Sequence, residues 1–321
     1  MTKLIKIFVL SLAALQFIAA SAQPRGYSIS PVNAESVVSE AYVRTCVETL
    51  CDDTMEGRAT GTAGSQKAAR YLDAEFRSIG LEPISGAYMH GFGDVFRPGR
   101  NVMGYLPGSG QGFVIVMAHY DGLGIVGGRI YPGADSNASG VAALLQLAKM
   151  AVRMNQVGYS FGKGILFVAV DAKEKNLAGS AELWSRLALG RLGLRTSDIS
   201  MVINIDQLGS TQAPLTKGNP DYLIMLTEGG RHMGTLESAS KVRNIRMELA
   251  GDYYGSRDFT TLFYRKISDQ KVFLENGVDC VMFTSGITML NNKPGDNPDS
   301  LDYPVLMKRI RLIFYFLFKI L

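Results

Sequence analysis

The sequence predicts a single α/β domain of three layers, in which a twisted, mostly parallel sheet lies between helices. Continuous apolar runs that suit buried strands alternate with amphipathic stretches along the chain, which is the pattern of such a fold. The composition agrees, because 47% of the 321 residues are hydrophobic and 19% are charged, as in ordinary globular proteins. One domain of about 295 residues is near the upper limit for a single core.

Residues 1–22 have the pattern of a secretory signal peptide. Two lysines precede an apolar run, and a small-x-small cleavage pattern (ASA) closes it. The uninterrupted apolar part is too short for a membrane span, which takes about 20 residues. We expect cleavage before Gln23, an exported mature domain over residues 23–321, and no membrane span after cleavage.

Charge and cysteine content exclude other protein classes. Lys and Arg number 33 against 29 Asp and Glu, a surplus too small for a typical nucleic-acid-binding protein. Three cysteines are too few for a disulfide scaffold. Cys46 and Cys51 point about 140° apart on a helix and should not pair if that helix is continuous. Cys280, in an apolar run, is expected to be a buried thiol.

The first half of the mature chain contains two helices, a strand, a helix and a second strand. Residues 34–51 and 65–79 have helical periodicity, with apolar residues along one face. Residues 113–117 (FVIVM) and 165–170 (ILFVAV) are continuous apolar runs suited to buried strands. Between these runs, residues 139–152 again show a helical pattern.

The second half continues this alternation. Residues 178–189 have the pattern of a helix. Three further apolar runs predict strands over residues 201–205, 222–226 and 278–283. The last helix is expected over residues 303–321 and becomes very apolar near its end.

Several predicted strands run directly into side chains that can bind a metal. His119 and Asp121 follow one strand, Glu174 comes shortly after another, and Asp206 follows a third. Open α/β sheets bind ligands at the carboxyl ends of their strands, and a mixture of His and carboxylate ligands favours zinc. Asp135, in the loop before the next helix, is well placed as another ligand. Each acid taken alone could be a helix cap or a solvated loop residue, but the set favours a site.

From about residue 45 to its end, the sequence carries short motifs in a particular order. They lie within residues 56–82, 101–104, 118–121, 133–140, 172–180, 204–206 and 283–296. In this order the motifs resemble the co-catalytic dizinc aminopeptidases, the family of bacterial leucyl aminopeptidases. Glutaminyl cyclases and glutamate carboxypeptidase are distant relatives of that family. The resemblance implies the zinc aminopeptidase fold.

The resemblance also implies roles for individual residues. In the family, one zinc uses a His and an Asp, the other uses a Glu and a second His, and one Asp bridges them. Carried over, His119 and Asp206 would hold one zinc, Asp135 would bridge, and Glu174 would begin the second site. Asp121 would accept a hydrogen bond from His119 and so orient its ring.

Two positions depart from the family pattern. The family has a Glu-Glu pair whose first member is the general base, and here the pair is Lys173-Glu174. Asn292 stands where the family has its second metal-binding His. An amide is a weaker zinc ligand than imidazole, and an ammonium repels a cation. We expect one zinc per chain at most, with Lys173 replacing the second ion and pairing with Asp135 and Glu174.

Three functions follow from this resemblance and its departures. The favoured one is an exported family member whose peptidase activity is lost or strongly reduced, and which either binds a peptide or a peptide-like small molecule or has a structural role. The second is an active exopeptidase or amidase that acts on peptide N termini with a single zinc. The third is a glutaminyl cyclase-like acyltransferase, which is disfavoured because Lys173 stands near the place of its acidic proton shuttle.

Overall fold

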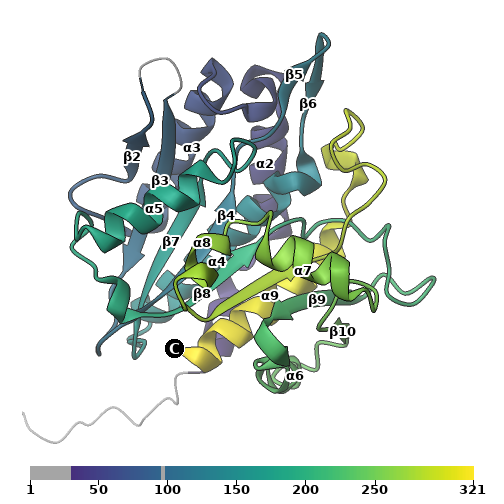
Figure 1. The fold of residues 1–321 in the computed structure, drawn as a ribbon. Helices are drawn as coiled ribbons and strands as arrows, with labels where there is room; N and C mark the ends of the chain where they lie inside the picture. Colours follow the sequence, from purple (N-terminus) through teal and green to yellow (C-terminus); the bar gives the residue numbers. More distant parts are fainter. Residues whose placement is uncertain (1–29, 95–97) are drawn as a thin grey trace, which may run out of the picture.

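The computed structural model describes residues 30–94 and 98–321, and the signal peptide predicted over residues 1–22 lies outside these ranges. Helices and strands alternate through most of the described chain (Figure 1). The strands are β1 (Glu82–Pro83), β2 (Met89–Phe92), β3 (Gly99–Leu106), β4 (Phe113–His119), β5 (Gly124–Val126), β6 (Arg129–Tyr131), β7 (Gly164–Val170), β8 (Ile199–Ile205), β9 (Tyr222–Thr227), β10 (Glu248–Ala250) and β11 (Cys280–Thr284).

The helices are of three kinds. The α-helices are α2 (Glu40–Cys51), α3 (Ala63–Ile79), α4 (Ser139–Gln156), α5 (Ala178–Ala188), α6 (Met233–Ser240), α7 (Arg257–Arg265), α8 (Lys271–Glu275) and α9 (Tyr303–Ile320). Short 3₁₀ segments are η1 (Pro31–Val37), η2 (Asp53–Arg58), η4 (Thr196–Asp198), η5 (Glu228–Gly230) and η6 (Pro298–Ser300), and η3 (Ala134–Ala138) is a π-helical turn.

The main sheet is parallel at its centre and antiparallel on both sides of it. Within the described residues its nine strands follow the order β1-β3-β7-β4-β8-β11-β9-β10, with β2 also paired to β3. The central strands β7, β4, β8 and β11 are mutually parallel, whereas β3 and β9 pair antiparallel to this group. The predicted α/β class is confirmed, and the sheet is mixed, with its parallel strands at the centre.

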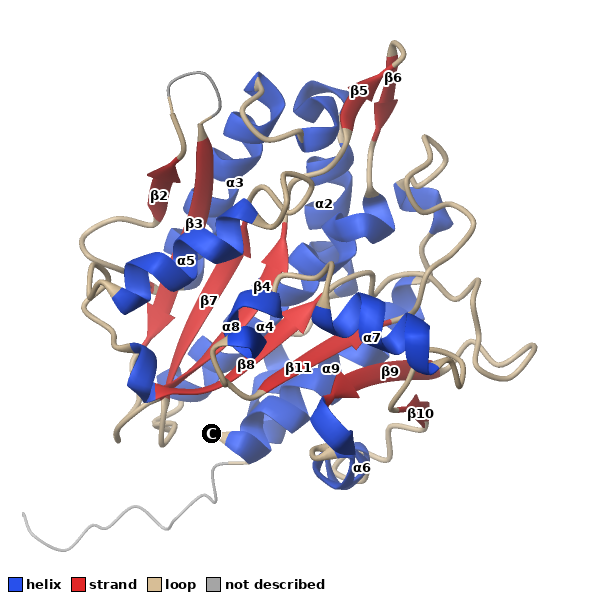
Figure 2. Ribbon diagram, viewed as in Figure 1, coloured by secondary structure: helices blue, strands red, loops and turns tan. Residues whose placement is uncertain are grey.

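Helices cover both faces of this sheet, which gives the molecule three layers (Figure 2). α2, α3, α4 and α9 pack on one face, and α5, α7 and α8 on the other. In β4, Val114 and Val116 join the core on the first face, while Ile115 and Met117 join the core on the second. Successive side chains of a strand point to opposite faces, so a strand covered on both faces must be apolar throughout.

The predicted helices are present with small shifts at their ends, but one of them is broken. The stretch predicted over residues 34–51 consists of η1 followed by α2. Ser39 between them is extended, and its side chain accepts a hydrogen bond from the backbone N–H of Tyr42. This N-cap begins a new helix. Thr62 caps α3 in the same way, and Gly80, with a φ of 92°, ends it.

The cysteines are buried, free thiols. Cys46 and Cys51 lie on one uninterrupted helix, α2, and therefore point in different directions. Cys280 is fully buried in β11. In the described part of the chain, no helix has the length and the apolar character needed to cross a membrane.

Candidate functional site

Three of the predicted site residues meet where the central parallel strands end. His119 is the last residue of β4, Asp206 follows β8, and Lys173 lies in the loop after β7. β4 pairs in parallel with both β7 and β8, so the loops beyond their carboxyl ends lie at one edge of the sheet. The exposed fractions of these side chains are 1% for His119, 4% for Asp206 and 16% for Lys173.

The amine of Lys173 lies between the other two side chains. Its Nζ is 2.9 Å from Asp206 Oδ2 and 3.0 Å from His119 Nε2. His119 Nε2 also lies 3.3 Å from Asp206 Oδ1. Burial and Lys173 lower the pKa of His119, but Asp206 and Asp121 together raise it to about 9. Lys173 is still the stronger base, because its pKa is raised above an ordinary value of about 10.4, so the proton between the two nitrogens stays on Lys173. The ammonium therefore donates to both partners, and the imidazole accepts through Nε2.

The opposite charges of Lys173 and Asp206 each favour the charged form of the other. Burial is the largest single influence and by itself lowers the pKa of Lys173, but the carboxylates of Asp206, Glu174 and Asp269 together outweigh burial and raise this pKa above its ordinary value. Burial also raises the pKa of Asp206, yet Lys173 and His119 together bring it well below its ordinary range. The structure corrects the predicted pairing. Lys173 forms its hydrogen bonds with Asp206 and His119, Glu174 contributes only the attraction of its charge, and Asp135 binds backbone amides instead.

Asp121 holds the cluster of His119, Lys173 and Asp206 in place through two kinds of contact. His119 Nδ1 lies 3.1 Å from the backbone carbonyl of Asp121 and 3.5 Å from its carboxylate. The ring N–H therefore donates to the carbonyl, which leaves Nε2 as the acceptor. The Asp121 carboxylate accepts from the backbone N–H groups of Lys173 and Glu174, each at 3.0 Å. Asp121 thus fixes the loop after β7 as well as the imidazole.

Asp135 does not face this cluster, which corrects its predicted role as a bridging ligand. Its Oδ1 accepts hydrogen bonds from the backbone N–H groups of Gly209, at 2.7 Å, and Ser210, at 3.1 Å. The carboxylate therefore anchors the loop after β8. Ser136, the next residue, lines the cavity described below instead.

The loop that carries Asp135 and Ser136 is fixed by a second carboxylate. Asp296 accepts hydrogen bonds from the backbone N–H of Asp135, at 2.7 Å, and of Ser136, at 3.1 Å. The side-chain amide of Asn137 also donates to the carbonyl of Ile205, at 2.9 Å. These contacts determine which of the two adjacent side chains faces the cavity.

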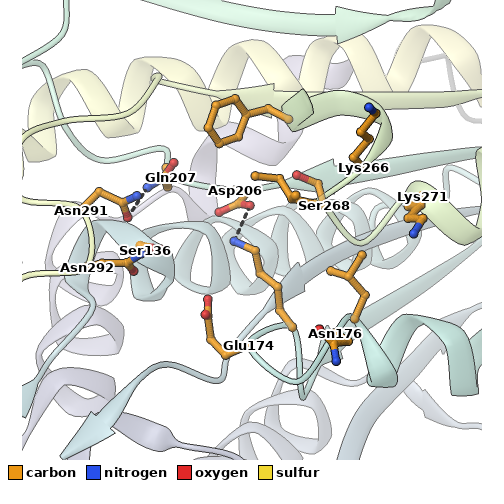
Figure 3. Close-up of a pocket in the computed structure, with 14 residues that line it drawn as sticks. Ser136, Glu174, Asn176, Asp206, Gln207, Lys266, Ser268, Lys271, Asn291 and Asn292 are labelled. Atoms are coloured by element: carbon orange, nitrogen blue, oxygen red, sulfur yellow. Dashed lines mark hydrogen bonds and ion pairs between the residues drawn. The ribbon is translucent and has the colours of Figure 1, made fainter. Parts of the chain in front are cut away.

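A cavity of about 390 Å³ adjoins the cluster (Figure 3). This volume is within the range of small-molecule sites, roughly 300–1,000 Å³. Glu174 and Asn292, two of the predicted ligand positions, line the cavity together with Ser136, Lys173 and Asp206. The other lining residues are Asn176, Leu177, Gln207, Phe263, Lys266, Ile267, Ser268, Lys271 and Asn291.

These residues do not fit a zinc ion. Zinc binds imidazole nitrogen and carboxylate oxygen at about 2.0–2.2 Å, so an ion held by both His119 and Asp206 would lie between them. The Lys173 ammonium already lies there, and the carboxylate of Asp135 is turned to backbone amides. Across residues 30–94 and 98–321, no group of three or more His, Cys, Asp and Glu side chains is arranged to hold a metal.

Several residues at this site were not predicted from the sequence. Ser136, Lys266 and Lys271 line the cavity, and Asp269 is fully buried beside the cluster. Burial raises the pKa of Asp269 to about 6. Asp269 lies in a polar stretch, residues 268–270, between α7 and α8, so it is not one of the polar residues that follow a strand. The feature of the sequence that could have indicated it is this polar stretch, which comes shortly after an amphipathic helix.

Comparison with solved structures agrees with this fold. The zinc aminopeptidase BSAP from Bacillus subtilis aligns with a TM-score of 0.67, covering 88% of this chain and 95% of that one at 14% identity. The glutaminyl cyclase of Porphyromonas gingivalis aligns with a TM-score of 0.65, covering 89% and 99% at 18% identity. At such identities the likeness establishes the fold.

Two curated proteins are similar in sequence. The BOS complex subunit ncln of Danio rerio is 28% identical over 208 residues, which are 60% of this chain and 35% of that protein. The alkaline phosphatase isozyme conversion protein of Escherichia coli (strain K12) is 26% identical over 198 residues, 56% of this chain and 54% of that protein. The chain thus matches only about a third to a half of these relatives' lengths.

A match to a protein family covers a larger part of the chain. The family description "Peptidase family M28" matches residues 101–317, which include the central strands and every residue of the cluster. The chain therefore belongs to peptidase family M28.

Proposed function

We propose that this protein is a non-hydrolytic member of the M28 family that binds a peptide or a peptide-like small molecule. The observation that carries this proposal is the position of Lys173, whose ammonium lies between His119 and Asp206 at 3.0 and 2.9 Å. The cavity beside it, at about 390 Å³, supplies a binding site that does not depend on catalysis.

The protonation state of Lys173 supports the loss of hydrolysis. In the dizinc aminopeptidases that the sequence resembles, the residue at this position is a carboxylate that accepts a proton from water. A general base must be able to take up a proton near the operating pH. The pKa of Lys173 is raised by its contact with Asp206, so its amine already carries the proton. The ammonium can donate hydrogen bonds or neutralise a carboxylate, but it cannot accept a proton.

The two other functions considered for this chain lack comparable support. A single-zinc exopeptidase and a glutaminyl cyclase-like acyltransferase both use a metal, and the residues around Lys173 do not fit one. The likeness to a solved glutaminyl cyclase, at 18% identity, concerns the fold. It supplies no argument for acyl transfer by this chain.

The proposal is tested by assaying the purified protein for both metal and turnover. We expect no hydrolysis of a panel of aminoacyl anilides, with or without added zinc, and far less than one zinc per chain after dialysis. A zinc aminopeptidase assayed in parallel controls for the substrates and the buffer. Zinc-dependent turnover by the native chain that is abolished by Lys173→Ala would overturn the proposal and make Lys173 a catalytic residue.

We also infer that the protein is exported, from the signal-peptide pattern of residues 1–22. Expression of the full chain in a bacterial host should give a mature protein that begins at Gln23. N-terminal sequencing of the product checks this. An uncleaved product that stays with the cytoplasmic fraction would contradict export.

A further inference from the structure

The cavity is acidic near the cluster and basic at one end. Figure 3 shows Lys266 and Lys271 on the side opposite Asn291 and Asn292, with Glu174 between the two groups. Charges of opposite sign at separate places in one cavity suit a ligand that itself carries both signs.

The charged groups at both places are free to bind a ligand. In the described residues, the side chains of Glu174 and Lys266 form no hydrogen bond or ion pair with the protein, and the charge of Glu174 acts on Lys173 only from a distance, by raising its pKa. Lys271 Nζ lies 3.9 Å from Glu275 Oε1, a solvent-exposed contact that holds its amine weakly. By contrast, two of the three N–H groups of the Lys173 ammonium are already used by Asp206 and His119.

Apolar side chains lie between and beside these charges. Leu177, Phe263 and Ile267 line the cavity, and Ile267 is 41% exposed. Phe259, on the same helix as Phe263, is 58% exposed and its ring is parallel to the Phe263 ring. An apolar group of a bound ligand would cover part of this surface and gain by removal from water.

Amide side chains complete the lining. Asn176, Gln207, Asn291 and Asn292 contribute to the cavity wall, and Gln207 Nε2 donates to Asn291 Oδ1 at 2.8 Å. An amide both donates and accepts, so such a wall can pair with the N–H and the C=O of a peptide group.

From this arrangement we infer that the cavity binds a short peptide with two free termini. Its ammonium pairs with Glu174, its carboxylate lies at Lys266 and Lys271, and an apolar side chain packs against Phe263 and Ile267. This inference rests on the proposed function, because the peptide is held and not cleaved. It adds the chemistry of the ligand. Binding requires both the N-terminal ammonium and the C-terminal carboxylate, whereas an N-terminal exopeptidase would need only the free N terminus.

Calorimetric titration with leucyl-leucine, its C-terminal amide and its N-acetyl derivative tests the inference. Hydrogen bonds to charged groups are stronger than neutral ones, but exposure of the lysines weakens their effect, so we expect amidation to weaken binding roughly five- to tenfold. N-acetylation should weaken binding at least as much. Equal affinity for the acid and the amide would overturn the inference.

Paired variants show whether the named side chains recognise the termini. In Lys266→Gln/Lys271→Gln the preference for the acid over the amide should disappear, and in Glu174→Gln the penalty for N-acetylation should disappear. Controls with the same charge change use exposed residues that do not line the cavity: Lys175→Gln/Lys217→Gln and Glu237→Gln. Loss of the preference in these controls would overturn the assignment, because a general charge effect would then explain it.

Chromatography of the titrated samples separates the two proposals. Intact leucyl-leucine together with end-dependent binding supports both of them. Cleavage to leucine would contradict the non-hydrolytic function. Intact peptide that does not bind, or that binds regardless of its ends, would overturn the assignment of the ligand and leave the loss of hydrolysis standing.

Discussion

At the scale of single residues, Lys173 supplies a fixed positive charge at the junction of three strands. Its ammonium neutralises the buried carboxylate of Asp206 and donates to His119 Nε2, which itself lies 3.3 Å from Asp206 Oδ1. A buried acceptor left without a donor costs about 1–3 kcal/mol, and more when it is charged. Lys173 is therefore expected to stabilise the folded protein as well as to oppose the binding of a metal ion.

Replacing Lys173 with methionine tests this structural role. Breaking a buried ion pair by removing one partner costs about 3–5 kcal/mol, so Lys173→Met should lower the free energy of unfolding by about that amount. In a double-mutant cycle with Asp206→Asn, the two effects should fall short of additivity by about 1–3 kcal/mol. Urea denaturation measures both. The control is Lys175→Met, at an exposed neighbour; a cost for Lys173→Met no larger than that of the control would refute the ion pair.

Ser136 gives a second prediction at this scale, because it faces the cavity where Asp135 was expected to do so. The triple variant Ser136→Asp/Lys173→Glu/Asn292→His places two carboxylates and an imidazole in the cavity and removes the ammonium. We expect it to retain at least one zinc per chain after dialysis, measured by elemental analysis.

The informative comparison is with Lys173→Glu/Asn292→His, which leaves Ser136 in place. If Asp135 could serve as the shared ligand, this double variant would bind as much zinc as the triple variant. We expect it to bind much less, because the Asp135 carboxylate is held by the N–H groups of Gly209 and Ser210. Circular dichroism checks that both variants are folded.

At the scale of elements, the last helix organises the loop after β8. Arg309 of α9 is fully buried, and its guanidinium donates to the carbonyls of Leu208 and Ser210, at 2.8 and 2.7 Å, and of Tyr222, at 2.8 Å. The same loop supplies the N–H groups that hold Asp135. A planar group with five donors can bind several carbonyls at once.

Removal of that guanidinium should therefore be costly. Arg309→Met keeps an unbranched side chain but leaves three carbonyls without this donor, and each buried unsatisfied group costs about 1–3 kcal/mol. We expect a loss of at least about 3 kcal/mol in the free energy of unfolding, measured by urea denaturation. Lys319→Met, at an exposed position of the same helix, should change it by less than about 0.5 kcal/mol. Similar costs for the two variants would show that the carbonyls find other donors.

At the scale of the whole molecule, the fold buries several carboxyl groups behind the strand ends. Burial raises the pKa of Asp135 to about 7, and that of Asp171 and Asp269 to about 6 each. A carboxyl whose pKa is higher in the folded state than in the unfolded chain contributes stability at low pH. This contribution is lost as the pH rises through the folded-state pKa.

Asp135→Asn isolates one of these groups. Between pH 5.5 and pH 8 the native protein should lose about 2 kcal/mol of stability through Asp135, because the folded state must then ionise a buried carboxyl. The variant has no such proton to lose, so its stability relative to the native protein should rise by about that amount over the same interval. Thermal unfolding at several pH values measures this difference. A constant difference across the interval would show that Asp135 does not titrate there.

The sequence by itself determined the class of fold and the place of the site. Strands covered on both faces must be apolar throughout, and helices covered on one face must repeat their apolar residues with the helical period, so both are visible in the chain. Because polar residues directly follow the predicted strands, His119 and Asp206 could be assigned to one edge of the sheet. The motifs also identified the unusual lysine and asparagine, at positions 173 and 292.

Only the tertiary structure decided what these side chains do. Residues in an irregular loop follow no period, so the sequence could not show that Ser136 lines the cavity while Asp135 turns to the amides of another loop. A lysine amine stands at the end of a long flexible stem, and its partner was decided by which strands are neighbours. The basic end of the cavity comes from Lys266 and Lys271, on either side of the loop between α7 and α8, and packing of that loop over the strand ends brings them to the site.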